Sequence, residues 1–277
     1  MAIRIVSDSS SDVFRVPDVD YTTVPLKVMF GSKEYVDEAG VDCERMMLDL
    51  QNHNGPSTTS CPNLKEWLNA FEGYDEIFGV TISSGLSASY STAVMAKQEY
   101  EAAHPDAKIH IFDSLATGPV LQLIIDKLRE GILAGKTFEQ IKEETIAYQK
   151  SLRILYALAS LNNLARNGRV NATVARVVSA LNIRIIGDAS EDGQVNLLRK
   201  CRGERRTINA MVNEMGARGF TGGTVHIDHS INLAGANKLK DAIEEAFPDA
   251  KVYIHACGVL CSYYADMSGI IVGYDVA

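Results

Sequence analysis

Short apolar runs rich in Ile and Val alternate along the chain with longer stretches whose apolar residues recur every three or four positions. The first pattern is typical of buried strands and the second of amphipathic helices. Predicted strands span residues 3–6, 23–29, 76–81, 108–113, 154–159, 183–186, 224–227, 252–256 and 270–274. Predicted helices span residues 43–51, 64–71, 88–103, 119–134, 138–151, 171–181, 205–216 and 233–247. This alternation predicts an α/β fold with a largely parallel sheet flanked by helices.

The chain is long enough for two lobes. At 277 residues it exceeds the usual size of one hydrophobic core. Gly135-Lys136-Thr137 reads as a helix end followed by a new N-cap, and strand character resumes after Ser151. We therefore predict an N-terminal α/β lobe over residues 1–150, with hydroxyl-rich loops, and a C-terminal α/β lobe over residues 151–277. Because no Pro/Gly/Ser-rich linker separates them, the lobes are expected to pack tightly.

Charge and cysteine content limit the partners and the compartment. The chain has 27 Lys and Arg against 35 Asp and Glu, a net charge of -8 that disfavours nucleic acid and anionic membranes. Its densest basic run, residues 199–206, is predicted to be the solvated start of a helix. Five scattered cysteines do not suggest a disulfide framework, and Cys257 and Cys261 fall in an apolar, strand-like stretch. With no leader sequence and no long apolar window, the expected protein is cytoplasmic, without a transmembrane segment.

Hydroxyl side chains cluster where the predicted strands end. The clusters are residues 7–12 (SDSSSD), 57–62 (STTSCP), 81–89 (TISSGLSAS) and 113–114 (DS). Ser, Thr and Asp are also the preferred helix N-caps, so capping alone explains any single cluster. In an open α/β sheet, however, the carboxyl ends of neighbouring strands meet at one crevice. Hydroxyls and helix N-terminal amides gathered there favour an anion such as a carboxylate or phosphate.

A serine hydrolase is the main enzymatic alternative. Residues 85–89 (GLSAS) resemble the Gly-x-Ser-x-Gly nucleophile elbow, but Ser89 stands where the tight turn usually requires glycine. An esterase or thioesterase would use Ser87 as its nucleophile. Its base and its orienting acid would have to come from the set His226, His229, His255, Asp8 and Asp113, which no characteristic spacing connects.

Phosphate-loop, dinucleotide and metal motifs are not evident. Neither Gly-x-x-x-x-Gly-Lys-Ser/Thr nor Gly-x-Gly-x-x-Gly occurs. His226 and His229 lie three residues apart in a predicted strand, so their side chains should project to opposite faces. We therefore expect no metal ion and no cofactor, and no catalytic residue of the chain's own.

The hydroxyl clusters together resemble those of the DegV family of bacterial fatty-acid-binding proteins, over nearly the whole chain. The opening VSDSSSD of residues 6–12 resembles the family signature after its first strand. Residues 59–62 (TSCP) are similar to Thr-Ser-x-Pro, and residues 83–90 (SSGLSASY) to Ser-Ser-Gly-Leu-Ser-Gly-Thr-Tyr. Asp113-Ser114 fits the pair that follows, and residues 164–170 (LARNGRV) resemble the family segment that ends Gly-Gly-Arg-Ile.

The resemblance implies a long-chain fatty acid bound between two α/β lobes and presented to a separate kinase subunit. It implies Thr59, Ser60, Ser87 and Tyr264 as carboxylate-binding residues and Arg169 as a partner-facing residue. The supporting residues would be Asp8, Ser9, Ser84, Gly85, Asp113 and Ser114.

The C-terminal stretch departs from the family pattern. Tyr264 stands at the family's histidine, or Tyr263 if the register shifts by one, and residues 266–268 (DMS) replace Gly-Pro-Gly. A tyrosine hydroxyl donates to a carboxylate but cannot supply the switchable charge of imidazole. Asp266 would oppose an anion unless it points away. A different carboxylate ligand is therefore a further alternative.

Overall fold

The structure is a computed structural model that describes residues 3–171 and 183–276, and the strands in these residues form three sheets. The first sheet is parallel, in the order β2-β1-β6-β7, with β1 (Ile3–Asp8), β2 (Asp20–Val24), β6 (Glu76–Thr81) and β7 (Lys108–Asp113). The second is mixed, in the order β10-β9-β8-β13-β11-β12, with β8 (Leu152–Leu158), β9 (Ile183–Ala189), β10 (Val195–Arg202), β11 (Gly223–His229), β12 (Ala250–Ala256) and β13 (Ile270–Asp275). The third is a small antiparallel sheet, β4-β3-β5, with β3 (Lys27–Phe30), β4 (Lys33–Val36) and β5 (Ser57–Ser60).

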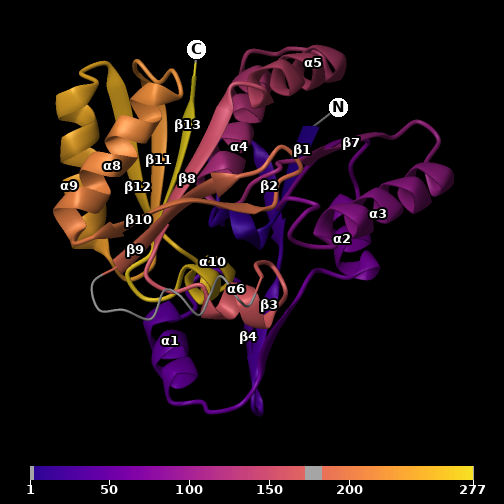
Figure 1. The fold of residues 1–277 in the computed structure, drawn as a ribbon. Helices are drawn as coiled ribbons and strands as arrows, with labels where there is room; N and C mark the ends of the chain where they lie inside the picture. The colour runs from indigo at the N-terminus through magenta and orange to yellow at the C-terminus, as the bar shows by residue number, and fades with distance from the viewer. Residues whose placement is uncertain (1–2, 172–182, 277) are drawn as a thin grey trace.

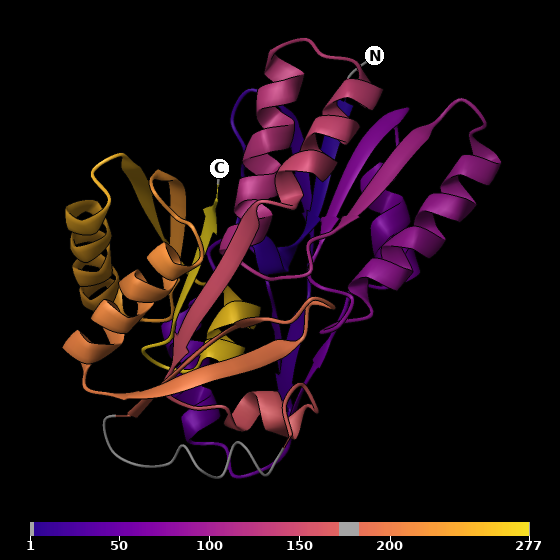
Figure 2. The same ribbon diagram turned by 45° about the horizontal axis from the view of Figure 1, so that its top comes forward.

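Helices cover both faces of the two large sheets (Figures 1 and 2). One face of the parallel sheet packs against α2 (Leu64–Phe71) and α3 (Ser89–Ala103), and the other against α4 (Pro119–Leu133) and α5 (Phe138–Gln149). Adjacent residues of β1 show this directly, since Ile5 and Val6 are both fully buried but belong to different apolar clusters. Strands buried on both faces read as continuous apolar runs.

Helix α4 lies between the two large sheets. Its apolar side chains pack on β6 and also on β8, β11 and β13, whose opposite face is covered by α8 (Glu204–Ala217) and α9 (Leu233–Ala246). All residues from Pro119 to Ile125 are buried. Burial around the whole circumference is typical of a helix that is enclosed by other elements, as this part of α4 is.

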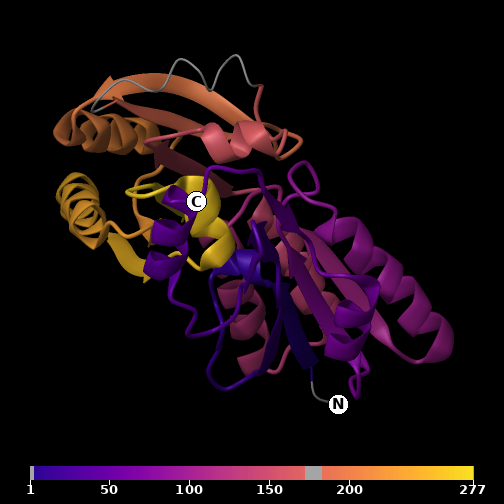
Figure 3. The same ribbon diagram turned by 90° about the horizontal axis from the view of Figure 1, so that it is seen from below.

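The small sheet belongs to a separate apolar cluster with α1 (Cys43–Gln51) and α10 (Val259–Ala265). Figure 3 shows α10 beside α1 on the lower face of the molecule, near α6 (Asn162–Arg166). A short 3₁₀ helix, η1 (Ser9–Ser11), follows β1 and contacts α10. Segments from the beginning and the end of the chain therefore meet around α10.

The predicted α/β class and the parallel sheet are confirmed, and most predicted elements lie within a few residues of their observed bounds. The predicted strand over residues 23–29 is wrong, because Pro25 divides it into β2 and β3, which belong to different sheets. Proline lacks the N–H that a continuous ladder requires. Strands β4 and β10 were not predicted, and the predicted helix over residues 171–181 lies almost wholly outside the described residues.

Two local interpretations also need correction. Residues 199–202 of the basic run end strand β10, and the helix begins only at Glu204, because the run pairs with β9 in an antiparallel ladder at the edge of the mixed sheet. Cys261 lies in helix α10 and not in a strand. Within the described residues, all strands of the parallel sheet precede residue 150 and all strands of the mixed sheet follow it. The division into lobes at residue 150 stays a prediction. None of the helices described is long and apolar enough to cross a bilayer.

Candidate functional site

Three of the four hydroxyl clusters meet at the carboxyl edge of the parallel sheet, and Asp8 connects two of them. Its carboxylate accepts hydrogen bonds from Ser10 Oγ at 2.5 Å, Ile82 N at 2.9 Å and Ser89 Oγ at 2.6 Å. Burial raises the pKa of Asp8, and the hydrogen bonds from Ser10 and Ser89 oppose this rise. The Asp8 carboxylate therefore accepts its hydrogen bonds from groups of the protein, and its supporting role in a ligand site stays a prediction. Ser9 is likewise buried, donating to Asp37 Oδ2 at 2.8 Å.

The clusters after β6 and β7 are joined in the same way. Asp113 Oδ1 accepts from Ser84 N at 3.0 Å, and Ser114 N donates to Thr81 O at 3.2 Å. Gly85 allows the turn between β9 and β10 to approach, because a Cβ at this position would lie 2.6 Å from Asp192 O. These residues shape the loop that carries Ser87, and their polar groups form hydrogen bonds within the chain.

The fourth cluster is a strand and not a loop, which corrects the prediction that it follows a strand end. Residues 57–60 form β5, and helix α10 links this strand to the second half of the chain. Thr59 Oγ1 is 2.8 Å from Tyr264 Oη, and Ser57 Oγ is 2.7 Å from Tyr263 Oη. Two adjacent tyrosines thus connect β5 to α10 through their hydroxyls.

A cavity of about 300 Å³ lies between the two halves of the chain and contains all four predicted carboxylate-binding residues in its lining. Thr59, Ser60, Ser87 and Tyr264 provide hydroxyls, and Thr117 and two cysteines are further polar neighbours. The remaining lining is mostly apolar: Leu26, Ile82, Leu86, Ala88, Ile154, Leu158, Leu164, Val195, Leu260, Ala265 and Ile271. An apolar cavity of this size with a few convergent polar groups is the usual form of a small-molecule site.

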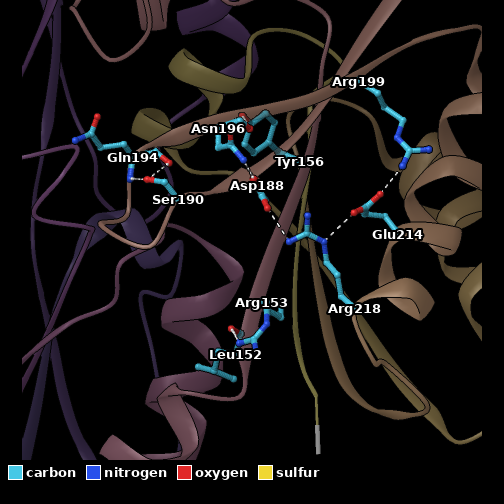
Figure 4. A network of polar contacts seen from close by, with 10 residues as sticks. All are labelled: Leu152, Arg153, Tyr156, Asp188, Ser190, Gln194, Asn196, Arg199, Glu214 and Arg218. Carbon is cyan, nitrogen blue, oxygen red and sulfur yellow. Dashed lines mark hydrogen bonds and ion pairs between the residues drawn. The ribbon is translucent and has the colours of Figure 1, made fainter.

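Tyr156 is a rigid part of the cavity wall, held by a polar network behind it (Figure 4). Its hydroxyl donates to Asn196 O at 2.6 Å, and the Asn196 amide donates to Asp188 Oδ1 at 2.7 Å. Asp188 Oδ2 pairs with Arg218 Nη1 at 2.6 Å. Gly187 lies under the phenol, because a Cβ there would be 2.1 Å from Tyr156 Oη. Burial raises the pKa of Tyr156, so this wall stays neutral.

Arg169 lies in the cavity lining and is half-buried. Its Nε donates to Leu86 O at 2.9 Å and its Nη1 to Asn167 O. Among the described residues no carboxylate forms an ion pair with this guanidinium. A half-buried cation without an anion is costly, and an anionic ligand would remove that cost. The partner-facing role of Arg169 stays a prediction.

Tyr264 is suited to donate a hydrogen bond. Burial raises its pKa, while the hydrogen bond with Thr59 and the positive charge of Arg169 lower it, and the net direction is upward. The phenol therefore keeps its proton at neutral pH. Asp266 is not in the cavity lining, and its Oδ1 accepts from Met267 N at 2.7 Å.

Among the described residues, no base forms a hydrogen bond with Ser87 that could activate its hydroxyl as a nucleophile. Its Oγ accepts from Ser89 N at 3.2 Å, and no hydrogen bond joins it to a histidine. His226 Nδ1 lies 3.0 Å from His255 Nε2 and His226 Nε2 lies 3.1 Å from Asp126 Oδ2, but none of these residues is in the cavity lining. In residues 3–171 and 183–276, no group of three or more His, Cys, Asp or Glu could hold a metal ion.

Sequence comparison identifies the family. A family model described as "Uncharacterised protein, DegV family" matches residues 2–272. The chain belongs to the DegV family. DegV domain-containing proteins of Streptococcus pneumoniae and Streptococcus gordonii are 36% and 35% identical to it over 280 residues, covering the whole of both chains in each case.

Solved structures of DegV proteins have the same fold. A DegV family protein from Eubacterium eligens loaded with heptadecanoic acid has a TM-score of 0.97 and 38% identity, with full coverage of both chains. The fatty acid kinase (Fak) B3 protein of Streptococcus pneumoniae, loaded with linoleic acid, also has a TM-score of 0.97, with 36% identity and full coverage. The predicted resemblance is therefore confirmed.

Some members of the cavity lining were not predicted. Tyr156 alternates with Ile154 and Leu158 along β8, and this period of two would have placed all three on one face. Cys261 was interpreted only as a core residue, although it contributes to the lining. Helix α10, which carries Cys261, has only seven residues and is too short to show a helical periodicity in the sequence.

Proposed function

We propose that this DegV protein binds one long-chain fatty acid, with the carboxylate at Thr59, Ser60, Ser87 and Tyr264 and the acyl chain in the apolar part of the cavity. The observation that carries the proposal is that Arg169, which forms no ion pair among the described residues, and four hydroxyls lie together in the lining of a largely apolar cavity. Two relatives of known structure with more than 30% identity, from Eubacterium eligens and Streptococcus pneumoniae, are described as loaded with a long-chain acid. We also propose that Arg169 acts as a counter-ion to the ligand, while its partner-facing role stays a prediction.

The apolar and the polar parts of the lining are expected to have different roles, the first in affinity and the second in selectivity. Each methylene removed from water contributes about 0.8 kcal/mol, so the tail dominates the gross binding energy. Hydrogen bonds to a charged carboxylate contribute about 1.5–3 kcal/mol each and select acids over esters or alcohols. We further propose that residues 1–150 and 151–277 act as two lobes that enclose the ligand, because both halves contribute to the lining.

Native mass spectrometry of freshly purified protein tests this function. We expect an adduct with the mass of a fatty acid, lost on denaturing extraction, and a higher Tm when palmitate or oleate is added back to stripped protein. Ser87→Ala should weaken acid binding and leave the fold intact. Repeated extraction without lipid, together with no stabilisation by added acids, would reject the proposal. A response to short carboxylates alone would instead indicate a different carboxylate ligand.

We also propose that the bound acid is presented to a separate kinase subunit that phosphorylates its carboxylate. Support comes from the full-length similarity to a protein named as the B3 component of fatty acid kinase. Incubation with a kinase subunit and ATP should produce acyl phosphate only when both proteins are present. An esterase would act alone, so labelling of Ser87 by a fluorophosphonate probe and turnover of p-nitrophenyl esters would oppose this role.

A further inference from the structure

Helix α10, which carries Tyr264, is held at its N-terminus by two carboxylates from the first half of the chain. Gly258 N donates to Asp12 Oδ1 at 2.8 Å, and Val259 N donates to Asp37 Oδ1 at 2.6 Å. Gly258 is required by this approach, since a Cβ there would lie 2.7 Å from Asp37 Oδ1 and 2.9 Å from Asp12 Oδ1. The partial positive charge of a helix N-terminus favours such carboxylates.

A third carboxylate, Asp228 of β11, meets Asp12 without a donor between them. Asp228 accepts from Gln122 Nε2 at 3.0 Å on both oxygens, and Asp12 Oδ2 is buried without a hydrogen-bond partner among the described residues. The two carboxyl groups lie on the same side of Gly118, where an added Cβ would be 2.8 Å from Asp228 Oδ2 and 3.9 Å from Asp12 Oδ2, and they are close enough for a side-chain hydrogen bond from Asp12 to Asp228. Two ionised carboxylates only accept hydrogen bonds, so their contact is repulsive. One proton between them supplies the missing donor.

The surroundings favour retention of that proton. Burial is the largest cause that raises the pKa of Asp12, and the charges of Asp228 and Asp37 add to it. Burial likewise raises the pKa of Asp228 to about 8 and that of Asp37 to about 6. The other titratable and charged groups that face the cluster are Asp8, Cys43, Cys257 and Cys261 inside, and Arg15, Asp126, Arg129, His226 and His255 along an outer groove.

That outer groove adjoins the pair on one side. It has a volume of about 360 Å³, and both Asp12 and Gln122 contribute to its lining, whereas Asp228 is fully buried behind them. Burial lowers the pKa of His255 to about 4, so this histidine is neutral above pH 6 and does not offset the carboxylates.

We propose that one proton shared between Asp12 and Asp228 joins the two halves of the chain and fixes α10, so that Tyr264 reaches the ligand only while this proton is bound. Asp12 and Asp228 are then positioning residues for the site. The link to Tyr264 rests on the proposed function, whereas the shared proton rests on the cluster alone.

The sign of the pH dependence follows from the direction of the shifts. Because the pKa of Asp228 is raised from its ordinary 3.8 to about 8 in the folded protein, the folded state holds a proton that the unfolded chain releases above pH 4. The stability due to this proton is fully present below pH 4 and is lost as the pH rises through about 8. A window from pH 6.5 to 8.0 reports this loss. The titration of unfolded histidine raises stability over the same window, but it is common to the wild type and the variants, so the difference between them reports the Asp12–Asp228 proton.

Thermal unfolding of lipid-free protein in this window is the first test. Between pH 6.5 and 8.0 the shared proton should contribute a decrease of about 4 °C to the wild-type Tm, measured relative to Asp228→Asn. In Asp228→Asn the amide donates to Asp12 and its oxygen accepts from Gln122, so this contribution should be absent and Tm at pH 8.0 should rise. Asp241→Asn removes an exposed charge and should keep the wild-type decrease. If Asp228→Asn does not fold, Asp12→Asn places the same amide donor on the other side.

Three outcomes would overturn the inference. The first is a wild-type pH dependence in both Asp228→Asn and Asp12→Asn. The second is restoration of Tm at pH 8.0 by NaCl or MgCl₂ to its value at pH 6.5, which would place a cation and not a proton between the carboxylates. The third is palmitate affinity of wild-type protein that does not change between the two pH values, which would overturn the positioning role of the pair.

The ligand experiment separates this inference from the proposed function. We expect wild-type affinity for palmitate to fall about fivefold from pH 6.5 to 8.0, and that of Asp228→Asn to stay constant. If neither protein binds any fatty acid at either pH, the proposed function fails, and the Tm comparison still decides whether the proton is shared.

Discussion

Two adjacent tyrosines of α10 should respond to loss of the hydroxyl in opposite ways. Tyr263 is fully buried, and its hydroxyl contacts Ser57 Oγ at 2.7 Å and Asn167 Nδ2 at 2.8 Å. Tyr264 is partly exposed to the cavity and contacts Thr59 Oγ1 at 2.8 Å. Tyr263→Phe should therefore reduce stability, and Tyr264→Phe should reduce ligand affinity.

The magnitudes follow from what each substitution leaves unpaired. In Tyr263→Phe, the buried Ser57 hydroxyl loses its partner and the half-buried Asn167 amide keeps only its hydrogen bond to Asn163 O, at a cost of about 2–3 kcal/mol together. This corresponds to a decrease in Tm of about 5–10 °C for a chain of this size. Tyr264→Phe should lower stability by about 1 kcal/mol or less, because solvent in the cavity can replace the hydroxyl, but should raise the Kd for palmitate about 10- to 100-fold.

Differential scanning fluorimetry of stripped protein and calorimetric titration with palmitate measure the two effects separately. Tyr263→Phe should keep a Kd within about threefold of the wild type, below the 1.4 kcal/mol that a tenfold change represents. The reasoning would be refuted if Tyr263→Phe unfolded at the wild-type temperature, or if Tyr264→Phe bound palmitate with wild-type affinity.

Three further substitutions test other contacts. Gly258→Ala should lower the free energy of unfolding by about 1–3 kcal/mol, because its Cβ would lie 2.7 Å from Asp37 Oδ1, and urea unfolding would measure this. Arg169→Gln should weaken binding of fatty acids but not of the corresponding alcohols, and equal losses for both would contradict its role as counter-ion. Arg218→Ala should cost about 1–2 kcal/mol by leaving Asp188, which is 7% exposed, without its cation, and unchanged urea unfolding would count against this network.

The parallel sheet and its flanking helices could be predicted because their patterns are local. Strands such as β6 and β7 are apolar runs buried on both faces, and a run of that kind carries its own signal. Strand β5 carries none, since STTS has no apolar residue and is a strand only through its ladder with β3. Helix α10 could not be predicted from the sequence either, because its seven residues are nearly all buried and show no periodicity.

The site residues could be named from the hydroxyl clusters, but their partners could not. Sequence spacing does not reveal that Thr59 meets Tyr264 across 205 positions, or that Asp12 meets Gly258 across 246. Both contacts depend on α10 returning to the first half of the chain. Similarly, the pattern of β8 indicates that Tyr156 is buried but not that Asn196 holds its hydroxyl. Long-range polar contacts of this kind are decided by tertiary structure.

The position of α4 between the two large sheets has a consequence for how the protein comes apart. The helix supplies apolar surface to β6 on one side and to β8, β11 and β13 on the other. Chain cleavage near residue 150 would leave this helix with one half and expose the surface that covers the other. Neither fragment would then fold by itself, and the intact chain should denature as a single cooperative unit, with ligand exchange confined to small local openings.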